Sequence, residues 1–290
     1  MSQQGLIAVN GLSKVFQDAE NRVIALNDIN LQILEGQIYG IVGMSGAGKS
    51  TLMRCMLGFL RHEGNVELYG GKVARRNHRI FENVAFIPDV SGLDDRLTVA
   101  QTIDYVRGVN SRWNEERAAQ LFALSNLPLK KKVGKLSKGM KTKLYLLITL
   151  SLDVNMLLLD EPTLGLDIAF RKEFFNTILG EFFNEERSIL ISTHQVEEVE
   201  DLLQEIIIID NGRIILHEEV EALKERYRVV SLPSDRSAEI LAHSPKVTSK
   251  TLGFFSAVLD SRVEIPGAAY GRVNLADIFL SVVGGSNETA

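Results

Sequence analysis

The segment that most restricts the fold of this chain is GMSGAGKS at residues 43–50, which fits the pattern G-x-x-x-x-G-K-[ST]. It follows a short apolar run at 37–42 and precedes residues 49–59, whose apolar side chains have helical spacing. Glycines let a backbone turn tightly and point its N–H groups at an anion, and a helix N-terminus adds a partial positive charge there. The segment therefore predicts a strand, a phosphate-binding loop and a helix.

Individual residues of this loop have distinct expected roles. Lys49 should neutralise the β- and γ-phosphates of a nucleoside triphosphate, and the Ser50 hydroxyl should bind Mg²⁺. The other residues expected to contact the nucleotide here are Gly43, Ser45, Gly46, Ala47, Gly48 and Thr51. The alternative is a glycine-rich turn without a ligand, which the flanking strand and helix disfavour.

An apolar run at 156–159 ends abruptly in two acids, Asp160 and Glu161. This pattern is typical of a buried parallel strand whose carboxyl end faces a site. Because an unpaired carboxylate is costly to bury, Asp160 should pair with a cation, and nucleotide-bound Mg²⁺ is the expected one. Glu161 points to the other side of the chain and suits the orientation or deprotonation of an attacking water. The alternative is a strand that merely ends in solvent.

Charge and hydropathy exclude several classes of protein. The 32 Lys and Arg against 37 Asp and Glu give a net charge of −5, so no nucleic-acid partner is expected from bulk charge. The single cysteine, Cys55, cannot form an intramolecular disulfide, and MSQQGLIAVN lacks the regions of a signal peptide, so we expect a cytoplasmic chain. The apolar stretch 144–152 is about half the roughly 20 residues that span a bilayer. Any pore would have to come from another chain.

The periodicities predict an α/β fold with a phosphate-loop NTPase core of mainly parallel sheet. We expect an N-terminal antiparallel β subdomain over 5–36 and a two-residue hairpin at Asn211-Gly212. The domain boundaries expected are 1–225 for the main domain, with a helical insertion at about 90–155, and 226–290 for a small C-terminal α/β extension. Further elements are expected as helices at 98–109, 114–125, 168–184 and 194–204, and as strands at 156–159, 188–192 and 205–209.

The order and spacing of the motifs resemble the nucleotide-binding subunits of ATP-binding cassette (ABC) transporters. The loop at 43–50 is followed by KLSKGMK at 135–141, MLLLDEP at 156–162, Gly165-Leu166-Asp167 and His194. The resemblance covers about residues 6–225, and the middle motif separates this family from other phosphate-loop proteins. From its own residues, that middle motif predicts only a serine-capped helix start able to grip phosphate.

The resemblance implies an ATPase with ATP and Mg²⁺ as cofactors. It implies a head-to-tail dimer, either a homodimer or a heterodimer with a related ATPase, in which Ser137 and Gly139 act on the partner's nucleotide and Asp167 reaches across. His194 would contact the γ-phosphate and the catalytic water. Phe16 would stack on adenine, although a core position is an equal alternative. The chain would sit on the inner face of the cell membrane through a separate integral membrane permease.

Several residues depart from the family pattern. Asp89 stands where a glutamine is usual, and it could still reach Mg²⁺ through water. Lys138 replaces a glycine and Met140 a glutamine in the middle motif. These departures predict weaker or partner-dependent hydrolysis.

The subtype is indicated by two segments that differ in character. Residues 20–57 are similar to methionine-importer ATPases, whereas 135–141, Asp89 and the closing NLADIFL resemble exporter-type and drug-efflux ATPases, so an exporter is favoured. The alternatives are a methionine-importer-like ATPase, a weakly hydrolysing nucleotide-dependent adaptor, and a soluble machine acting in DNA repair or on ribosomes. The last usually carries a long coiled coil, zinc cysteines or a second cassette.

Overall fold

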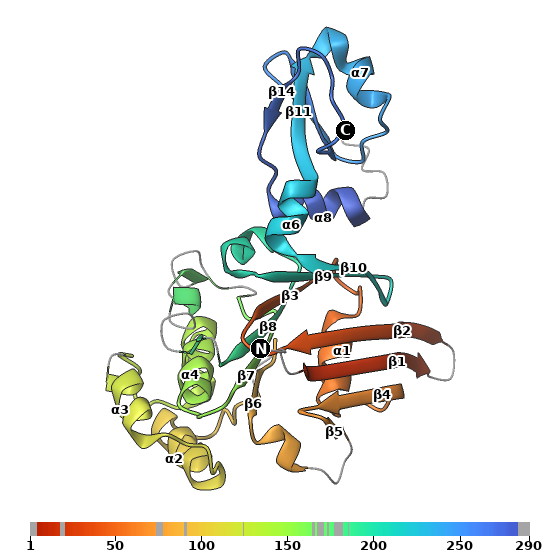
Figure 1. Cartoon of the computed structure of the whole chain (residues 1–290). Coiled ribbons are helices and arrows are strands. Elements are labelled where there is room, and N and C mark those ends of the chain that lie inside the picture. The colour runs from red at the N-terminus through yellow and green to blue at the C-terminus, as the bar shows by residue number, and fades with distance from the viewer. Residues whose placement is uncertain are drawn as a thin grey trace.

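The structure, a computed structural model, describes residues 5–17, 21–73, 78–89, 92–123, 125–163, 166, 171–172, 174–176, 182–184 and 186–283. Its strands form a six-stranded sheet and two four-stranded sheets. In Figure 1 the helices α2–α4 lie on one side of the six-stranded sheet, the N-terminal sheet lies on the other, and the C-terminal sheet stands at one end.

The six-stranded sheet has the strand order β10-β9-β3-β8-β7-β6 and is parallel except for β10. Its members are β3 (Ile38–Val42), β6 (Val84–Ile87), β7 (Met156–Asp160), β8 (Ser188–Thr193), β9 (Glu205–Asp210) and β10 (Arg213–Glu219). Every residue of β3, β7 and β8 is buried, as expected of apolar strands covered on both faces. Val42 pairs with Thr193, and Asp160 pairs with Ser192. The carboxyl ends of these three strands therefore meet at one edge, where the loop at 43–50, the two acids and His194 follow them.

The N-terminal sheet is antiparallel and has the order β2-β1-β4-β5. It consists of β1 (Gly5–Gln17), β2 (Arg22–Leu34), β4 (Glu63–Leu68) and β5 (Gly71–Lys72). Its apolar residues share one core with α1 (Lys49–Met56) and with one face of the large sheet, including Ile41 and Leu158. This packing fixes the helix that follows the glycine-rich loop.

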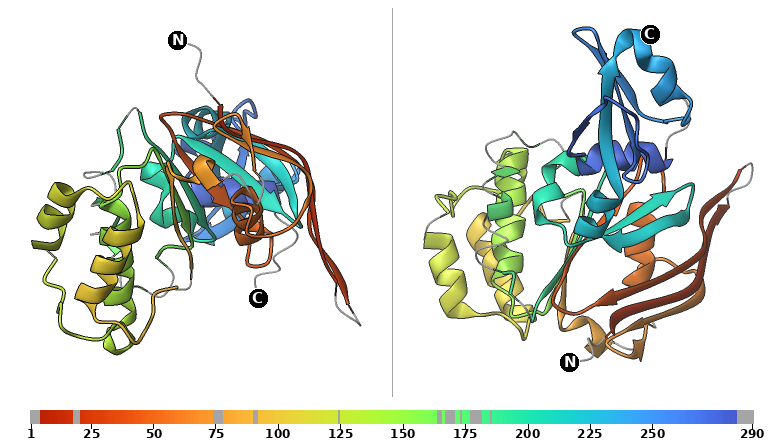
Figure 2. Two further views of the ribbon diagram at one scale, coloured as in Figure 1. Left: turned by 90° about the horizontal axis from the view of Figure 1, so that it is seen from below. Right: turned by 45° about the horizontal axis from the view of Figure 1, so that its top comes forward.

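Three helices lie between β6 and β7 in sequence: α2 (Val99–Val109), α3 (Glu115–Ala123) and α4 (Lys138–Leu150). Thr98 and Gln101 form a capping box at the start of α2, and Ser137 caps α4, as polar residues with short side chains commonly do. The apolar residues of α4 pack with the other face of the large sheet, including Val42 and Leu159. Figure 2 shows these helices beside the sheet. The helices predicted at 98–109 and 114–125 are confirmed.

The helix predicted at 194–204 is wrong. Two short 3₁₀ turns, Val196–Glu198 and Glu200–Leu202, occupy this segment. Val196 and Val199 are both buried, and Leu202 packs against the same core. A 3₁₀ helix places residues three apart on one face, so a segment with apolar residues at this spacing buries them best in that form. Most of the predicted helix at 168–184 lies outside the described residues.

The hairpin predicted at Asn211-Gly212 is confirmed, because these residues join β9 to β10 with φ values of 47° and 72°. After β10 comes a third sheet with the order β12-β13-β11-β14. The elements of this part are α6 (Val220–Arg226), β11 (Tyr227–Pro233), α7 (Ser237–Leu241), β12 (Thr248–Thr251), β13 (Phe254–Asp260), β14 (Ala269–Gly271) and α8 (Leu275–Val283).

The third sheet has a small core of its own, which includes Val230, Ile240 and Leu259. By contrast, Leu275 and Phe279 of α8 pack into the core of the main sheet, which attaches this part to the rest of the chain. None of the helices in the described ranges combines the length and the apolar surface that crossing a bilayer requires.

Candidate functional site

The loop between β3 and α1 has a backbone that requires glycine. A Cβ on Gly43 would lie 2.4 Å from the Ile209 carbonyl oxygen, and one on Gly48 would lie 2.7 Å from the Ala25 carbonyl oxygen. Gly46 has open space around it and a φ of 83°, which non-glycine residues rarely adopt. No side chain caps the start of α1, so its first N–H groups remain available to an anion.

The other residues expected to contact the nucleotide lie in the same loop or in the first turn of α1. Ser45 and Ala47 lie in the turn just before α1, and Ala47 donates its N–H to the Met44 carbonyl at 3.1 Å. Thr51 lies in the first turn of α1. The loop thus wraps around the helix start in the way the motif predicted.

Lys49 is held inside the loop and by an acid from another strand. Its side chain is 5% exposed, and its Nζ donates to the carbonyls of Gly43 at 2.8 Å and Met44 at 3.2 Å. The same Nζ lies 3.1 Å from Glu161 Oε1, and Glu161 Oε2 lies 2.8 Å from His194 Nδ1. Glu161 therefore bridges the lysine of the loop and the histidine that follows β8.

Asp160 is fully buried and only half satisfied. Its Oδ1 accepts hydrogen bonds from Ser50 Oγ at 2.8 Å and Ser192 Oγ at 2.6 Å, whereas its Oδ2 has no hydrogen-bond partner. Burial raises the pKa of the Asp160 carboxyl, and the two serine hydrogen bonds oppose that rise. A buried carboxylate oxygen without a hydrogen-bond partner, beside a serine hydroxyl, suits a hard cation such as Mg²⁺.

The two adjacent acids point to different partners because of the backbone at Glu161. This residue has a φ of 46°, an uncommon value for a non-glycine residue. Its N–H donates to the Ser192 carbonyl at 3.1 Å and to Ser192 Oγ at 3.2 Å, so β8 fixes the turn. As a result Asp160 contacts Ser50 while Glu161 contacts Lys49.

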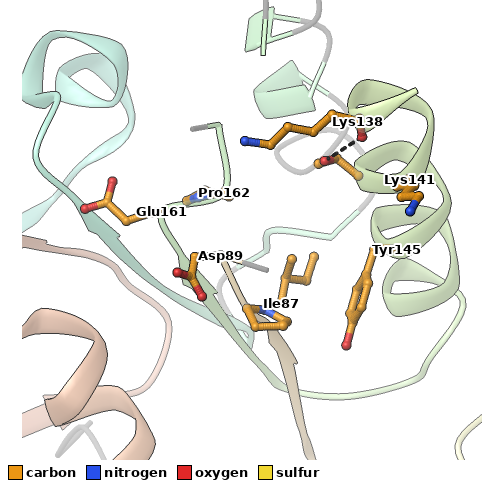
Figure 3. A pocket seen from close by; sticks show the side chains of 9 residues that line it. Ile87, Asp89, Lys138, Lys141, Tyr145, Glu161 and Pro162 are labelled. Carbon is orange, nitrogen blue, oxygen red and sulfur yellow. Dashed lines mark hydrogen bonds between the residues drawn. The ribbon is translucent and has the colours of Figure 1, made fainter. Parts of the chain in front are cut away.

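Asp89 lies just beyond β6 and forms an ion pair with Arg54 Nη2 at 3.1 Å. It also lines a pocket between the end of the large sheet and α4, in which the side chain of Glu161 lies on the same side as Asp89 and those of Lys138 and Tyr145 lie across it (Figure 3). The full lining is Ile87, Pro88, Asp89, Lys138, Lys141, Thr142, Tyr145, Glu161 and Pro162.

Phe16 is near the end of β1 and is 42% exposed. The alternative that it belongs to the core is therefore wrong. The Lys14 ammonium lies 4.7 Å from the centroid of the Phe16 ring, so one ring face is already in contact with a cation. Stacking on adenine stays a prediction.

Ser137 and Gly139 lie at the start of α4. Ser137 Oγ accepts a hydrogen bond from the Met140 N–H at 3.2 Å, and a Cβ on Gly139 would find its nearest neighbour 3.9 Å away. Since α4 and α1 pack on opposite faces of the large sheet, the chain does not bring these residues to its own phosphate loop. Asp167 lies outside the described residues.

Sequence reasoning missed two residues of this site, Ser192 and Arg54. Ser192 is a fully buried hydroxyl within the apolar strand β8, and a polar residue in such a strand is a signal for a buried partner. Arg54 is a basic residue in the last turn of α1. Nothing in its spacing indicates which acids it meets.

Comparison with known proteins gives concordant matches. A family model described as ABC transporter matches residues 26–164. The ABC transporter ATP-binding protein YtrB of Bacillus subtilis is 25% identical over an alignment of 292 positions that covers 97% of this chain and 99% of that protein. The Nod factor export ATP-binding protein I of Burkholderia orbicola is 30% identical over an alignment of 295 positions that covers 93% of this chain and 96% of that protein. A solved dimeric structure of a bacterial ABC transporter cassette has a TM-score of 0.63 at 21% identity, covering 74% of this chain and 99% of that chain.

Proposed function

This chain belongs to the ATP-binding subunits of ABC transporters and is an ATPase; from that premise we propose that it binds Mg²⁺·ATP and drives a separate integral membrane permease, in a system of exporter type. The observation that carries the proposal is the convergence of the phosphate loop with two acids from β7: Ser50 meets Asp160 at 2.8 Å and Lys49 meets Glu161 at 3.1 Å. These are the groups that a triphosphate and its metal would need in one place.

Ser50 and Asp160 are the residues that would hold Mg²⁺. Bound there, the ion would neutralise charge on the β- and γ-phosphates during phosphoryl transfer. Asp160 is suited to this because its Oδ2 is buried without a hydrogen-bond partner, and a partner of opposite charge would offset the cost of burying it. Asp89 is the third residue proposed at the metal site.

Lys49 would exchange its present partners for phosphate oxygens. Its ammonium now binds two loop carbonyls and Glu161, and a γ-phosphate can replace the acid as its anionic partner. Glu161, released from Lys49, would then orient or deprotonate the attacking water, a role worth about 10² to 10⁴ in rate.

His194 would support Glu161 and sense the terminal phosphate. With Nδ1 lying 2.8 Å from Glu161 Oε2, the ring is held in one orientation, and with protons on both ring nitrogens its Nε2–H would donate to the γ-phosphate. The second nitrogen of the ring thereby becomes the contact that reports the presence of ATP.

Most of the remaining proposed contacts need a second subunit, homologous or identical. Ser137 and Gly139 at the start of α4 would grip the nucleotide of the partner, and Asp167 would reach across the dimer. Phe16, which needs no second subunit, would stack on adenine. The dimeric assembly of the solved cassette supports the second subunit, and the export role named for the Burkholderia relative supports the exporter type. Docked on its permease, the dimer would lie on the inner face of the cell membrane.

The test is ATP turnover by the purified chain, alone and with its permease in nanodiscs. We expect Mg²⁺-dependent phosphate release that falls roughly 100-fold or more in Lys49→Ala. Arg262→Met, which alters an exposed ion pair beside the third sheet, is the control and should keep the wild-type rate. Turnover unaffected by Lys49→Ala would refute the assignment of the site. Nucleotide binding without turnover in either setting would instead favour the adaptor function, for which Asp89 and the departures at Lys138 and Met140 are the motive.

A further inference from the structure

Arg54 lies between two carboxylates that come from different strands. Its Nη2 is 3.1 Å from Asp89 Oδ1 and 4.0 Å from Asp160 Oδ2. The latter oxygen is the one that has no hydrogen-bond partner. The guanidinium thus faces the open side of the acid proposed to hold Mg²⁺.

The three side chains differ in their exposure to solvent. Asp160 is 0% exposed, Asp89 is 30% exposed and Arg54 is 42% exposed. Because Asp160 is buried, a positive charge near its Oδ2 is weakly screened and interacts with it more strongly than a surface pair would. Arg54 is long and partly exposed, so it can move between the two acids without disturbing the core.

A metal ion at Asp160 Oδ2 would compete with this guanidinium, since both are cations and both would occupy the same side of the carboxylate. The contact of Arg54 with Asp89 is the shorter of the two, and it draws the guanidinium away from Asp160. We propose that Asp89 acts on the metal site through Arg54: by holding the guanidinium, it keeps Asp160 open to Mg²⁺. Arg54 is a positioning residue in this scheme, and the proposal rests on the Mg²⁺·ATP binding proposed above.

The scheme differs from one in which Asp89 contacts the metal directly or through water. In that case an acid at position 89 attracts the ion whatever stands at position 54. If Asp89 works through Arg54, its effect on the metal disappears once the guanidinium is removed. A pair of single variants and their double variant separates the two cases.

The measured quantity is the ratio of the ATP dissociation constant in EDTA to that in saturating Mg²⁺, from titration with a fluorescent ATP analogue. Arg54→Met keeps the aliphatic stem and removes the charge, so we expect this ratio to rise about three- to tenfold. Asp89→Asn releases Arg54 toward Asp160, so we expect the ratio to fall about three- to tenfold. In the double variant, Asp89→Asn should change the ratio of Arg54→Met by less than about twofold.

Binding of Mn²⁺ to the protein–ATP complex, measured by electron paramagnetic resonance, is an independent readout. Its affinity should be higher in Arg54→Met than in the wild type and lower in Asp89→Asn. Arg54→Lys retains a charge and should stay near the wild type. Arg262→Met, which breaks a pair at 2.7 Å in the third sheet, is the matched control and should leave the ratio unchanged. Thermal melting checks that every variant is folded.

If Asp89→Asn lowered the ratio of dissociation constants equally in the wild type and in Arg54→Met, the proposal would be overturned and Asp89 would contribute to the metal site directly. A lower ratio in Arg54→Met than in the wild type would overturn it as well, because the guanidinium would then be assisting the metal. If the wild type bound ATP equally well in EDTA and Mg²⁺, the proposed metal site itself would fail, and this proposal with it. A wild-type ratio above one with the wrong pattern in the variants refutes only the role of Arg54.

Discussion

Glu161→Gln separates binding from chemistry more sharply than any other change to this site. In the structure the Glu161 carboxylate occupies Lys49 at 3.1 Å and His194 at 2.8 Å. A triphosphate must displace this carboxylate from Lys49 in order to bind. Glutamine has nearly the same shape and no charge, so the variant should bind ATP more tightly while losing the group proposed to act on water.

The magnitude follows from the geometry of the pair. Two unit charges at this separation attract by about 5 kcal/mol at an effective dielectric constant of about 20, and the cost of burying both charges cancels most of that gain. Lys49 and Glu161 are 5% and 13% exposed, so a net value of about 1–2 kcal/mol is expected. Removing this competition should tighten ATP binding in EDTA about 5- to 30-fold. Hydrolysis should fall about 10²- to 10⁴-fold.

Two assays test this prediction: titration of a fluorescent ATP analogue in EDTA, and phosphate release in Mg²⁺. Glu205→Gln is the matched control, because Glu205 also faces a histidine, His217 at 3.5 Å, but on β9 and β10 away from the loop. The control should change neither quantity. Weaker ATP binding in Glu161→Gln, or hydrolysis at the wild-type rate, would refute the bridging role of this acid.

Three further perturbations have defined outcomes. Asp160→Asn removes a buried carboxylate whose pKa is raised by burial, so the free energy of unfolding of the metal-free chain should rise by about 1–2 kcal/mol at neutral pH, measured by thermal melting. This gain over the wild type should shrink as the pH falls through the raised pKa, because the wild-type carboxyl is then protonated. A destabilised variant would contradict the reasoning. Gly43→Ala places a Cβ 2.4 Å from the Ile209 carbonyl oxygen and should cost about 1–3 kcal/mol in urea unfolding, which an unchanged midpoint would disprove. Phe16→Ala should weaken ATP binding about 3- to 10-fold while Phe16→Tyr stays near wild type, and equal binding by all three proteins would remove Phe16 from the site.

The sequence by itself determined the local structure around the proposed site and the residue types that it presents there. The glycines of 43–48 permit a tight turn suited to an anion, and the apolar run before Asp160 is typical of a buried strand, so both features follow from residues a few positions apart. The turn at Asn211-Gly212 followed for the same reason, since two residues with positive φ are what a short hairpin needs. Such features depend on backbone sterics and on the period of side chains along one segment.

The tertiary structure alone decided which residues meet. Lys49 contacts Glu161 because β3, β8 and β7 are neighbours. Arg54 contacts Asp89 because α1 packs beside the end of β6. Neither contact can be predicted from the spacing of residues along the chain. The burial of Val196 and Val199 replaced an expected helix with 3₁₀ turns. Contacts between segments that are distant in sequence arise from strand order and layer packing, which are properties of the whole chain and outweigh local propensity.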